Sequence, residues 1–279
     1  MKIMTLNVHA WEEDQPLEKL ASLAQHINDQ DYDYILLQEV NQLLADPVVK
    51  PTRFIRPSHE EVDIPIKQSN YAYQLLKLLD YPYYWSWTPA HVGYGKYDEG
   101  LAILAKSSFA ARCQRISTNQ DYQDYRRRVV LAVHLSEKDL ELVSGHYSWW
   151  QSVDDEYPGQ SFQAEWDQTR KILTSGGRKI VGGDFNQLAH VNDQGYDYVL
   201  ATSDLLDAYR MATSPQGQAT VPGEIDGWEG DDAAKRIDYF FVSPNLNVQS
   251  YQTLFDGQAM PQVSDHFGIA LTLTRSTSF

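Results

Sequence analysis

The sequence predicts a mixed α/β fold that contains antiparallel as well as parallel strands. The chain opens with a strand at 2–8, a helix at 16–29 and an apolar strand at 34–40, an order typical of layered α/β proteins. Two further strands, at 128–135 and 140–148, are joined by the turn Ser-Glu-Lys-Asp and indicate a β-hairpin. About eight or more strands accompany about four helices, which disfavours a simple doubly wound parallel sheet.

The elements of the first half follow from residue type and periodicity. Strand 2–8 is rich in β-branched and apolar residues, and helix 16–29 begins with Pro16, which suits the first helical turn. One face of that helix carries Leu17, Leu20, Ala24 and Ile27. The polar, proline-containing segment 44–69 is expected to be a long irregular loop. After it we expect a helix at 71–80 and strands at 83–88 and 100–107.

In the second half, the segment 160–175 has helical periodicity and is followed by Gly176 and Gly177, which stop helices. The remaining expected elements are a strand at 179–185, a helix near 203–211, and strands at 236–243 and 267–275. No repeat, low-complexity tract or linker-like change in composition divides the chain. The sequence therefore predicts a single domain over 1–279.

Composition and charge narrow the possible partners. The 279 residues are 42% hydrophobic, as in a globular protein with a sizeable core. The 38 acidic residues outnumber 23 basic ones and give a formal net charge of −15, which repels phosphate backbones at long range. Nucleic acid is therefore disfavoured as the main substrate, unless a local basic groove offsets this charge.

Cysteine content and hydropathy indicate the compartment. Cys113 is the only cysteine, so no internal disulfide is possible, which fits a reducing compartment. The segment 1–11 does not resemble a signal peptide, because its apolar run is short and no small-residue cleavage site follows. No apolar run is long enough to predict a transmembrane helix. We therefore expect a cytoplasmic protein with no membrane partner, and its oligomeric state is left open.

Several predicted strands end in a short cluster of polar residues. A charged side chain inside a buried strand costs several kcal/mol unless it is paired or binds a metal. Taken singly, Asp238 suits a structural ion pair, His146 a hydrogen-bonded core histidine, and 184–186 a turn. The same feature recurs at six strands, however, and one shared site accounts for all of them. The residues concerned are Asn7, His9, Gln38, Glu39, His146, Asp184, Asn186, Asp238, Asp265 and His266.

These residue types suit metal-assisted hydrolysis of a phosphate ester. Carboxylate and carboxamide oxygens are the ligands that Mg²⁺ or Mn²⁺ prefers. The sequence contains no cysteine cluster and no His-Glu-x-x-His motif, so the usual zinc sites are unsupported. It also lacks the Gly-x-Ser-x-Gly motif of serine hydrolases and the glycine-rich motif of P-loop proteins.

Seven short motifs resemble, in order, those of the endonuclease/exonuclease/phosphatase superfamily. That group includes abasic-site nucleases, bacterial sphingomyelinases, inositol-polyphosphate 5-phosphatases and deadenylases. The motifs run from residue 5 to residue 269 and are TLNV, LLQEV, EGLAILAKS, SGHYS, GGDFN, RIDYFFVS and SDHFGI. The resemblance implies a four-layer αββα sandwich, in which two packed mixed β-sheets are flanked by helices, with the site at one edge of the sheets.

The resemblance also implies metal-binding residues. Asn7 and Glu39 match the positions that hold the divalent metal, Mg²⁺ or Mn²⁺. Asp265 matches a carboxylate that serves either as a metal ligand or as the partner of the terminal histidine. One departure is His9, because many nuclease members have Asp at this position. This departure weakens the abasic-nuclease interpretation, alters the expected metal shell and places His9 among the expected substrate-binding residues.

The remaining matches concern catalysis. His266 matches the histidine that contacts the scissile phosphate, and Asp238 matches the carboxylate that orients it. Asp184 matches the residue that positions or deprotonates the attacking water, with Asn186 beside it. His146 matches a histidine found in many phosphatase and sphingomyelinase members.

The glycines before Asp184 raise a separate expectation. Gly182 and Gly183 let a strand pack closely and turn, so that its end opens into the cleft, although an ordinary tight strand end is the other interpretation. Residues i and i+2 of an extended segment face the same side. Asp184 and Asn186 are therefore expected to aim at the same water.

Aromatic and basic residues near the predicted site bear on the substrate. Trp149 and Trp228 are candidates to stack on a sugar ring, although any single tryptophan more often belongs to the core. Arg127, in the run Arg126 to Arg128, is a candidate phosphate clamp. Surface charge at the start of a strand is the competing explanation for at least two of these arginines.

Longer segments resemble a subgroup of cytoplasmic enzymes from low-GC Gram-positive bacteria that includes a maltose 6'-phosphate phosphatase. They are NVHAWEE, YYWSWTPAHVGYGKYDEGLAIL, FQAEW and GEIDGWEG. This resemblance implies a Mg²⁺-dependent phosphomonoesterase that hydrolyses a sugar phosphate to sugar and inorganic phosphate. The alternative is a metal-dependent nuclease or other phosphodiesterase of the same superfamily. A non-enzymatic binding domain is disfavoured, because every matched catalytic residue is present.

Overall fold

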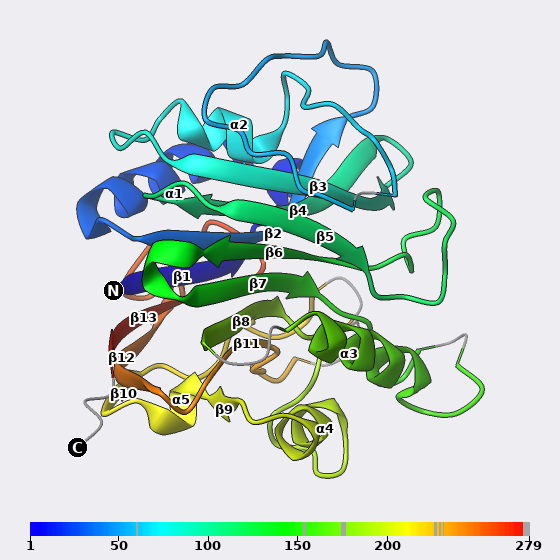
Figure 1. Cartoon of the computed structure of the whole chain (residues 1–279), viewed down its shortest axis with the longest axis vertical. Helices are drawn as coiled ribbons and strands as arrows, with labels where there is room; N and C mark the ends of the chain where they lie inside the picture. Colours follow the sequence, from blue (N-terminus) through cyan, green and yellow to red (C-terminus); the bar gives the residue numbers. More distant parts are fainter. Residues whose placement is uncertain are drawn as a thin grey trace.

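Two β-sheets pack face to face in the computed structural model, and helices cover the outer side of each sheet (Figure 1). The structure describes residues 1–59, 61–152, 155–173, 177–225, 228, 230 and 232–275. The expected four-layer αββα sandwich is therefore confirmed. No helix within the described residues is long and apolar enough to span a membrane.

The first sheet has seven strands in the order β10-β12-β13-β1-β2-β4-β3. It is mixed, because β1 pairs in parallel with β2 and antiparallel with β13. Its strands are β1 (Lys2–Asn7), β2 (Tyr34–Leu43), β3 (Tyr84–Gly93), β4 (Tyr97–Ala105), β10 (Ser214–Gln216), β12 (Leu246–Leu254) and β13 (Gly268–Arg275).

The second sheet has six strands in the order β5-β6-β7-β8-β11-β9. The predicted hairpin is its antiparallel pair β6 and β7, and β7 then runs parallel to β8. Its strands are β5 (Ala110–Arg115), β6 (Val129–Leu135), β7 (Leu140–His146), β8 (Arg178–Asp184), β9 (Leu206–Asp207) and β11 (Asp238–Val242).

Helices α1 to α4 lie in the two outer layers, whereas Ala208 of the short α5 packs in the core between the sheets. Helices α1 and α2 pack on the first sheet, whereas α3 and α4 pack on the second (Figure 1). The helices are α1 (Pro16–Gln30), α2 (Tyr71–Leu76), α3 (Gln160–Ile172), α4 (Gly195–Thr202) and α5 (Ala208–Met211), with short 3-10 helices at Ala10–Glu12 and Ser136–Lys138.

Three large apolar cores lie between the four layers, as the packing of strand β2 illustrates. Its alternate residues point to opposite faces of the sheet. Leu36 packs between the sheets with Leu142 of β7, whereas Leu37 packs with Leu23 under helix α1. On the other side of the molecule, Trp166 of α3 lies in the third core. Burial on both faces explains why the first part of this strand, 34–37, is apolar throughout.

Two helix predictions differ from the structure. The helix expected near 203–211 is wrong, because α4 comes earlier and only the single turn α5 falls in that range, after the short strand β9. The helix expected at 71–80 ends at Leu76. Beyond it, the Leu78 carbonyl and the Asp80 N–H bond to the Asn28 side chain of α1 instead of continuing the helix. Helix α3 ends at Ile172, and the predicted stop signal at Gly176 lies outside the described residues.

Strands β5 and β12 were absent from the sequence prediction. In β12, buried Leu246 and Val248 alternate with exposed Asn247 and Gln249, a signal of a half-buried strand that is visible in the sequence. In β5, the alternating buried residues include the small Ala111, so the signal is weaker.

The two glycines at the end of β8 serve close packing, as expected. A Cβ on Gly182 would lie 2.4 Å from the Phe240 ring. Gly183 has φ of +136°, and a Cβ there would lie 2.1 Å from the Gly145 carbonyl oxygen of β7. Backbone from β7 occupies the place of the missing side chain, so strands β7 and β8 approach as closely as the site edge requires.

Gly183→Ala is therefore expected to destabilise the fold by about 2–4 kcal/mol, because backbone cannot move aside as a flexible side chain can. Urea unfolding measures the change. Gly95→Ala is the control, because Gly95 also has positive φ, +65°, but nothing lies within 4 Å of its Cβ position. Equal losses in the two variants would show that the contact with Gly145 is unimportant.

Candidate functional site

Most of the predicted site residues meet at one edge of the sheets, where strands of both sheets end. Asn7 ends β1, His146 ends β7 and Asp184 ends β8. The strand register places His146 and Asp238 directly beside Asp184, one on each side. His266 lies just before β13, which pairs with β1.

Glu39 reaches this edge through an irregularity in its strand. The pairing of β2 with β4 shifts register here, and Glu39 has φ of 53°. The pairing of β3 with β4 shifts as well, and both shifts face Gly100, where a Cβ would lie 2.0 Å from the Thr88 carbonyl oxygen. Such bulges re-aim side chains, and this one turns Glu39 toward Asn7.

Asn7 links the two central carboxylates. Its Nδ2 donates to Glu39 Oε1 at 2.7 Å and to Asp184 Oδ2 at 3.1 Å. Its Oδ1 accepts from the His9 backbone N–H at 3.1 Å, and because an N–H only donates, this contact fixes the orientation of the amide. The predicted metal ligand Asn7 thus presents its amino group, and not its oxygen, to the carboxylates.

Asp184 lies at the centre of the group and is 1% exposed. Its Oδ2 is 3.5 Å from His146 Nε2 and 3.7 Å from His266 Nε2, while its Oδ1 accepts from the Asn186 N–H at 2.9 Å. Asn186 has φ of 51°, so the chain bends here instead of staying extended. The extended geometry expected for this segment is therefore wrong, although Asp184 and Asn186 both line one cavity.

His266 is paired with Asp238. The sequence had offered both Asp238 and Asp265 as partners of this histidine. Its Nδ1 lies 2.9 Å from Asp238 Oδ2, whereas Asp265 lies nearer His9. Burial alone would lower the pKa of His266, but the carboxylates of Asp238 and Asp184 raise it well above its usual range. His266 is therefore a buried cation beside Asp184.

The remaining groups fit a divalent cation. Glu39, His146 and Asp184 each offer a ligand atom within 4.8 Å of the other two. Burial raises the pKa of Glu39 to about 8 and that of Asp184 to about 7, although nearby His266 opposes the second shift. Burial lowers the pKa of His146 well below its usual range, and Arg128 acts in the same direction. The half-buried carboxylate of Glu39, the buried carboxylate of Asp184 and a neutral imidazole form a donor set that a cation would stabilise.

These shifts predict that the metal-free protein loses stability as the pH rises from 7 to 9. The pKa of Glu39 is raised to about 8, that of His9 to about 9 and that of His266 above its usual value, so the folded state binds more protons than the unfolded state. Stability then falls with rising pH. In EDTA we expect the Tm to drop by about 5 °C or more across this range. A Tm that stays level or rises would contradict these shifts.

His9 and Asp265 form a second group at the mouth of the site. His9 Nδ1 lies 3.0 Å from Glu13 Oε1 and 3.8 Å from Asp265 Oδ1, and its Nε2 lies 3.2 Å from the Tyr94 hydroxyl. Burial alone would raise the pKa of Glu13, but its hydrogen bonds to His9 and Lys19 hold it at about 2. Asp265 therefore sits with His9 and Glu13, apart from the group around Asp184.

Sequence reasoning missed the pair His91 and Glu99 behind Glu39. His91 Nε2 lies 3.2 Å from Glu99 Oε1, and both residues are buried. Burial would raise the pKa of Glu99, but His91 lowers it, so this carboxylate is ionised close to Glu39. The motif EGLAILAKS contains Glu99, but only the bulges opposite Gly100 show that it faces the site.

Arg127 does not face the site, and its neighbour Arg128 does. The Arg127 guanidinium donates to the Ala90 carbonyl and lies 3.4 Å from Glu61 Oε2. Arg128 lines the site cavity with Trp149, and its guanidinium carbon is 5.8 Å from the Trp149 ring. Consecutive residues at the start of strand β6 point to opposite sides of the sheet. Predicting Arg127 in place of Arg128 therefore selected a side chain that points away from the cavity.

The site residues line an inner cavity of about 310 Å³. It is bounded by His9, Glu39, His91, Gly93, Tyr94, Glu99, Tyr125, Arg128, His146, Trp149, Asp184, Asn186, Asp265 and His266. Asn7 and Asp238 lie behind this wall, where they hold Asp184 and His266. The cavity therefore gathers four histidines and four carboxylates beside a buried arginine.

A larger aromatic cavity of about 620 Å³ adjoins the inner one and shares Tyr125, Arg128, Trp149 and Asn186 with it. Trp228 lines this second cavity, and its Nε1 donates to Asn186 Oδ1 at 3.2 Å. The two predicted tryptophans thus both lie next to the site. The aromatic cavity also has Trp150, Gln151, Leu188, Val191 and Gln194 among its walls.

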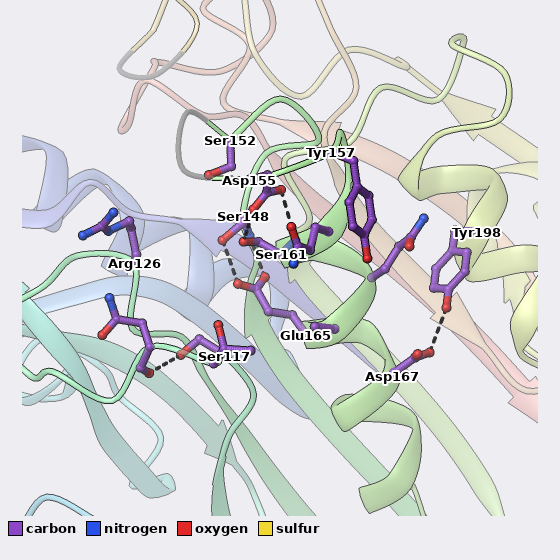
Figure 2. A pocket seen from close by; sticks show the side chains of 15 residues that line it. Ser117, Arg126, Ser148, Ser152, Asp155, Tyr157, Ser161, Glu165, Asp167 and Tyr198 are labelled. Carbon is purple, nitrogen blue, oxygen red and sulfur yellow. Dashed lines mark hydrogen bonds between the residues drawn. The ribbon is translucent and has the colours of Figure 1, made fainter.

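A third, polar cavity of about 500 Å³ shares Arg126, Ser148 and Ser152 with the aromatic cavity (Figure 2). Its floor is formed by Glu165, which accepts from the Ser148 N–H at 2.8 Å and from the Ser148 hydroxyl at 2.7 Å. Burial raises the pKa of Glu165 to about 7, although Arg128 opposes the shift. The three cavities therefore run one after another away from Asp184.

The segment 4–266 matches the model of the family described as "Endonuclease/Exonuclease/phosphatase family". A solved structure of a protein of that family from Leptotrichia buccalis is 32% identical, with a TM-score of 0.82 over 98% of this chain and 99% of that chain. A search of curated proteins found no significant match.

Two further solved structures are less similar in sequence. A mannosyl-6-phosphatase from Bacteroides thetaiotaomicron is 16% identical, with a TM-score of 0.66 over 98% of this chain and 99% of that chain. A 3' phosphatase from Neisseria, bound to a product DNA hairpin, is 19% identical, with a TM-score of 0.65 over the same shares. At these identities the likeness shows the fold alone.

Proposed function

The chain belongs to the endonuclease/exonuclease/phosphatase family, and from that premise we propose that it is a divalent-metal-dependent phosphomonoesterase acting on a small sugar phosphate. The observation that carries the proposal is the inner cavity, where Glu39, Asp184 and the cationic His266 lie side by side. Such a cavity suits the binding of a phosphoryl group even though the protein is acidic overall.

Glu39 is the proposed main ligand of the cation, Mg²⁺ or Mn²⁺. Asn7 holds the Glu39 carboxylate from behind, and Asp265 lies on the wall of the same cavity. When bound, the cation polarises a phosphoryl oxygen and offsets charge in the transition state. The Glu39 carboxyl, whose pKa is about 8 in the metal-free protein, must release its proton to bind the metal.

Asp184 is the proposed group that orients the attacking water and accepts its proton. Its pKa of about 7 in the metal-free protein suits a base that works near neutral pH. The Asn186 N–H and the Asn7 amino group each hold one of its oxygens, so the carboxylate cannot rotate freely. This orientation reduces the reorganisation that proton transfer requires.

His266 is the proposed cationic partner of the phosphoryl oxygens. Asp238 fixes its ring through Nδ1, which leaves Nε2 pointing toward Asp184 and the inner cavity. The Thr220 hydroxyl accepts from the Asp238 backbone N–H at 3.1 Å, which anchors the backbone that carries this carboxylate. A fixed cation stabilises charge that develops during phosphoryl transfer.

The aromatic cavity supports a sugar as the leaving group. Trp149 and Trp228 supply ring faces, and Gln151 and Gln194 supply hydrogen-bonding groups for hydroxyls. A mannosyl-6-phosphatase among the structural neighbours agrees with this choice without proving it. A nuclease would need a basic strip, but Arg126 is bound to Asp124 at 2.8 Å and Arg127 is buried. The single cysteine, Cys113, agrees with the cytoplasm as the place of action.

A panel of phosphorylated metabolites tests the function. EDTA-treated protein is assayed for inorganic phosphate release with and without added Mg²⁺, on hexose and disaccharide phosphates and on a 3'-phosphorylated DNA oligonucleotide. We expect Mg²⁺-dependent release from at least one sugar phosphate and little from the oligonucleotide. Phosphate release confined to the oligonucleotide would indicate a phosphomonoesterase that acts on nucleic acid and would contradict the sugar-phosphate substrate. Cleavage of the DNA strand would favour the phosphodiesterase alternative.

A further inference from the structure

We propose that Arg128 binds the phosphoryl group of the substrate at the junction of the inner and aromatic cavities. The inference rests on the proposed function and names a substrate-binding residue in addition to the predicted ones. It also gives the substrate a direction, because a phosphate held there directs its leaving group into the aromatic cavity.

The position of Arg128 is built into the fold. It lies just before β6 and is only 4% exposed, yet it lines both cavities. Its backbone N–H donates to the Ser117 hydroxyl at 2.9 Å, and its carbonyl accepts from the Ile116 N–H at 3.0 Å. These contacts hold the backbone in place, so the guanidinium reaches the junction from a fixed point.

The guanidinium lacks a close anionic partner. Among the described residues, no carboxylate lies within 4.0 Å of it and its side chain makes no hydrogen bond, and its Nε is buried without a partner. Its neighbours differ: Arg126 is bound to Asp124, and Arg127 to the Ala90 carbonyl and Glu61. A buried cation without a close counter-ion is costly, and a bound anion would remove that cost.

The groups around Arg128 favour a substrate anion over a permanent partner. The positive charge of Arg128 acts from a distance to lower the pKa values of the Glu99 and Glu165 carboxyls. It also lowers the pKa of His146 and so helps to keep that imidazole neutral. The Trp149 ring lies beside the guanidinium and limits its movement. The planar fork of an arginine binds two phosphate oxygens at once, which the point charge of a lysine cannot do.

The shared walls set the direction of the substrate. Arg128, Trp149 and Asn186 belong to both cavities, whereas Glu39 and His266 belong only to the inner one. A phosphate that contacts Arg128 and faces His266 therefore lies in the inner cavity at its border. Its ester oxygen then points past Trp149 into the larger cavity, which has room for a sugar ring.

Steady-state kinetics on p-nitrophenyl phosphate test the proposal. We expect Arg128→Gln to lower kcat/KM by about 100-fold, and Arg128→Lys to recover about tenfold of that loss. Arg53→Gln removes an equal charge from an exposed loop and should leave kcat/KM within about twofold. Values of kcat/KM for Arg128→Gln close to the wild type would overturn the proposal.

Binding of inorganic phosphate provides a test that needs no turnover. In EDTA, phosphate should raise the Tm of the wild type and of Arg53→Gln, and it should raise the Tm of Arg128→Gln much less. Equal shifts in all three proteins would overturn the role of Arg128. A wild type that binds phosphate through Arg128 but hydrolyses no phosphate ester would contradict the proposed function while sparing this inference.

Discussion

Asp184→Asn is expected to lower kcat for phosphate release by about 10³-fold while leaving the fold intact. Asparagine has the same shape and keeps an oxygen that can accept from the Asn186 N–H. It cannot take a proton from water, and its amino group would face that of Asn7, so one hydrogen bond is lost. The loss of a buried carboxylate close to Asp238 offsets that cost in stability.

Kinetics on the best sugar phosphate, with thermal unfolding in parallel, check this prediction. Asp155→Asn is the matched control, because Asp155 lines only the polar cavity, away from the inner one. It should change kcat by less than about threefold. Phosphate release by Asp184→Asn at the wild-type rate would remove Asp184 from the reaction.

Glu39→Gln is expected to raise the Mg²⁺ concentration for half-maximal activity by about 10–100-fold. Glutamine keeps the oxygen that accepts from Asn7, so the local structure is preserved, but the negative charge that attracts the cation is gone. The variant should also be more stable than the wild type in EDTA at pH 9. It lacks the half-buried carboxyl whose pKa of about 8 makes ionisation unfavourable there.

A Mg²⁺ titration of activity, with a second titration of Tm, measures both effects. Glu165→Gln is the control, because Glu165 is also a buried carboxylate with a raised pKa, about 7, but lines the polar cavity. Its Mg²⁺ requirement should match that of the wild type. A normal titration for Glu39→Gln would mean that the cation binds elsewhere.

The outline of the site could be predicted from the sequence because apolar strands are easy to locate and their ends meet at one edge of the sandwich. Side chains at the ends of these strands therefore converge, independently of the conformation of the loops. Examples are Asn7, His146 and Asp184. The pairing of Asp238 with His266 was implied by the family resemblance and not by the strand ends, and the two side chains lie 2.9 Å apart. Strand ends carry this information because their position depends on the core alone.

Features that depend on register were harder to predict. Arg127 and Arg128 are adjacent, and a shift of one residue decides which of them faces the cavity. Glu99 and His91 face the site because of bulges opposite Gly100, and nothing in the local sequence marks those bulges.

The cavities were beyond sequence reasoning for a different reason. The aromatic cavity is formed by segments as distant as Tyr125, Trp149, Gln194 and Trp228, which only the tertiary structure brings together. Composition showed that aromatic residues are abundant, but not that several of them share one cavity beside Asn186. The helix expected near 203–211 failed likewise, because strand β9 interrupts that region to pair with β11.

We propose above all that Glu39 binds a divalent cation beside Asp184 in the inner cavity and that this cation supports phosphate ester hydrolysis. Crystals grown with Mn²⁺ test it most directly, because anomalous scattering locates the metal without reference to activity. We predict the strongest anomalous peak in the inner cavity, within about 2.5 Å of a Glu39 carboxylate oxygen. A protein whose activity requires Mn²⁺, but whose Mn²⁺ peak lies away from Glu39 and Asp184, would contradict the account.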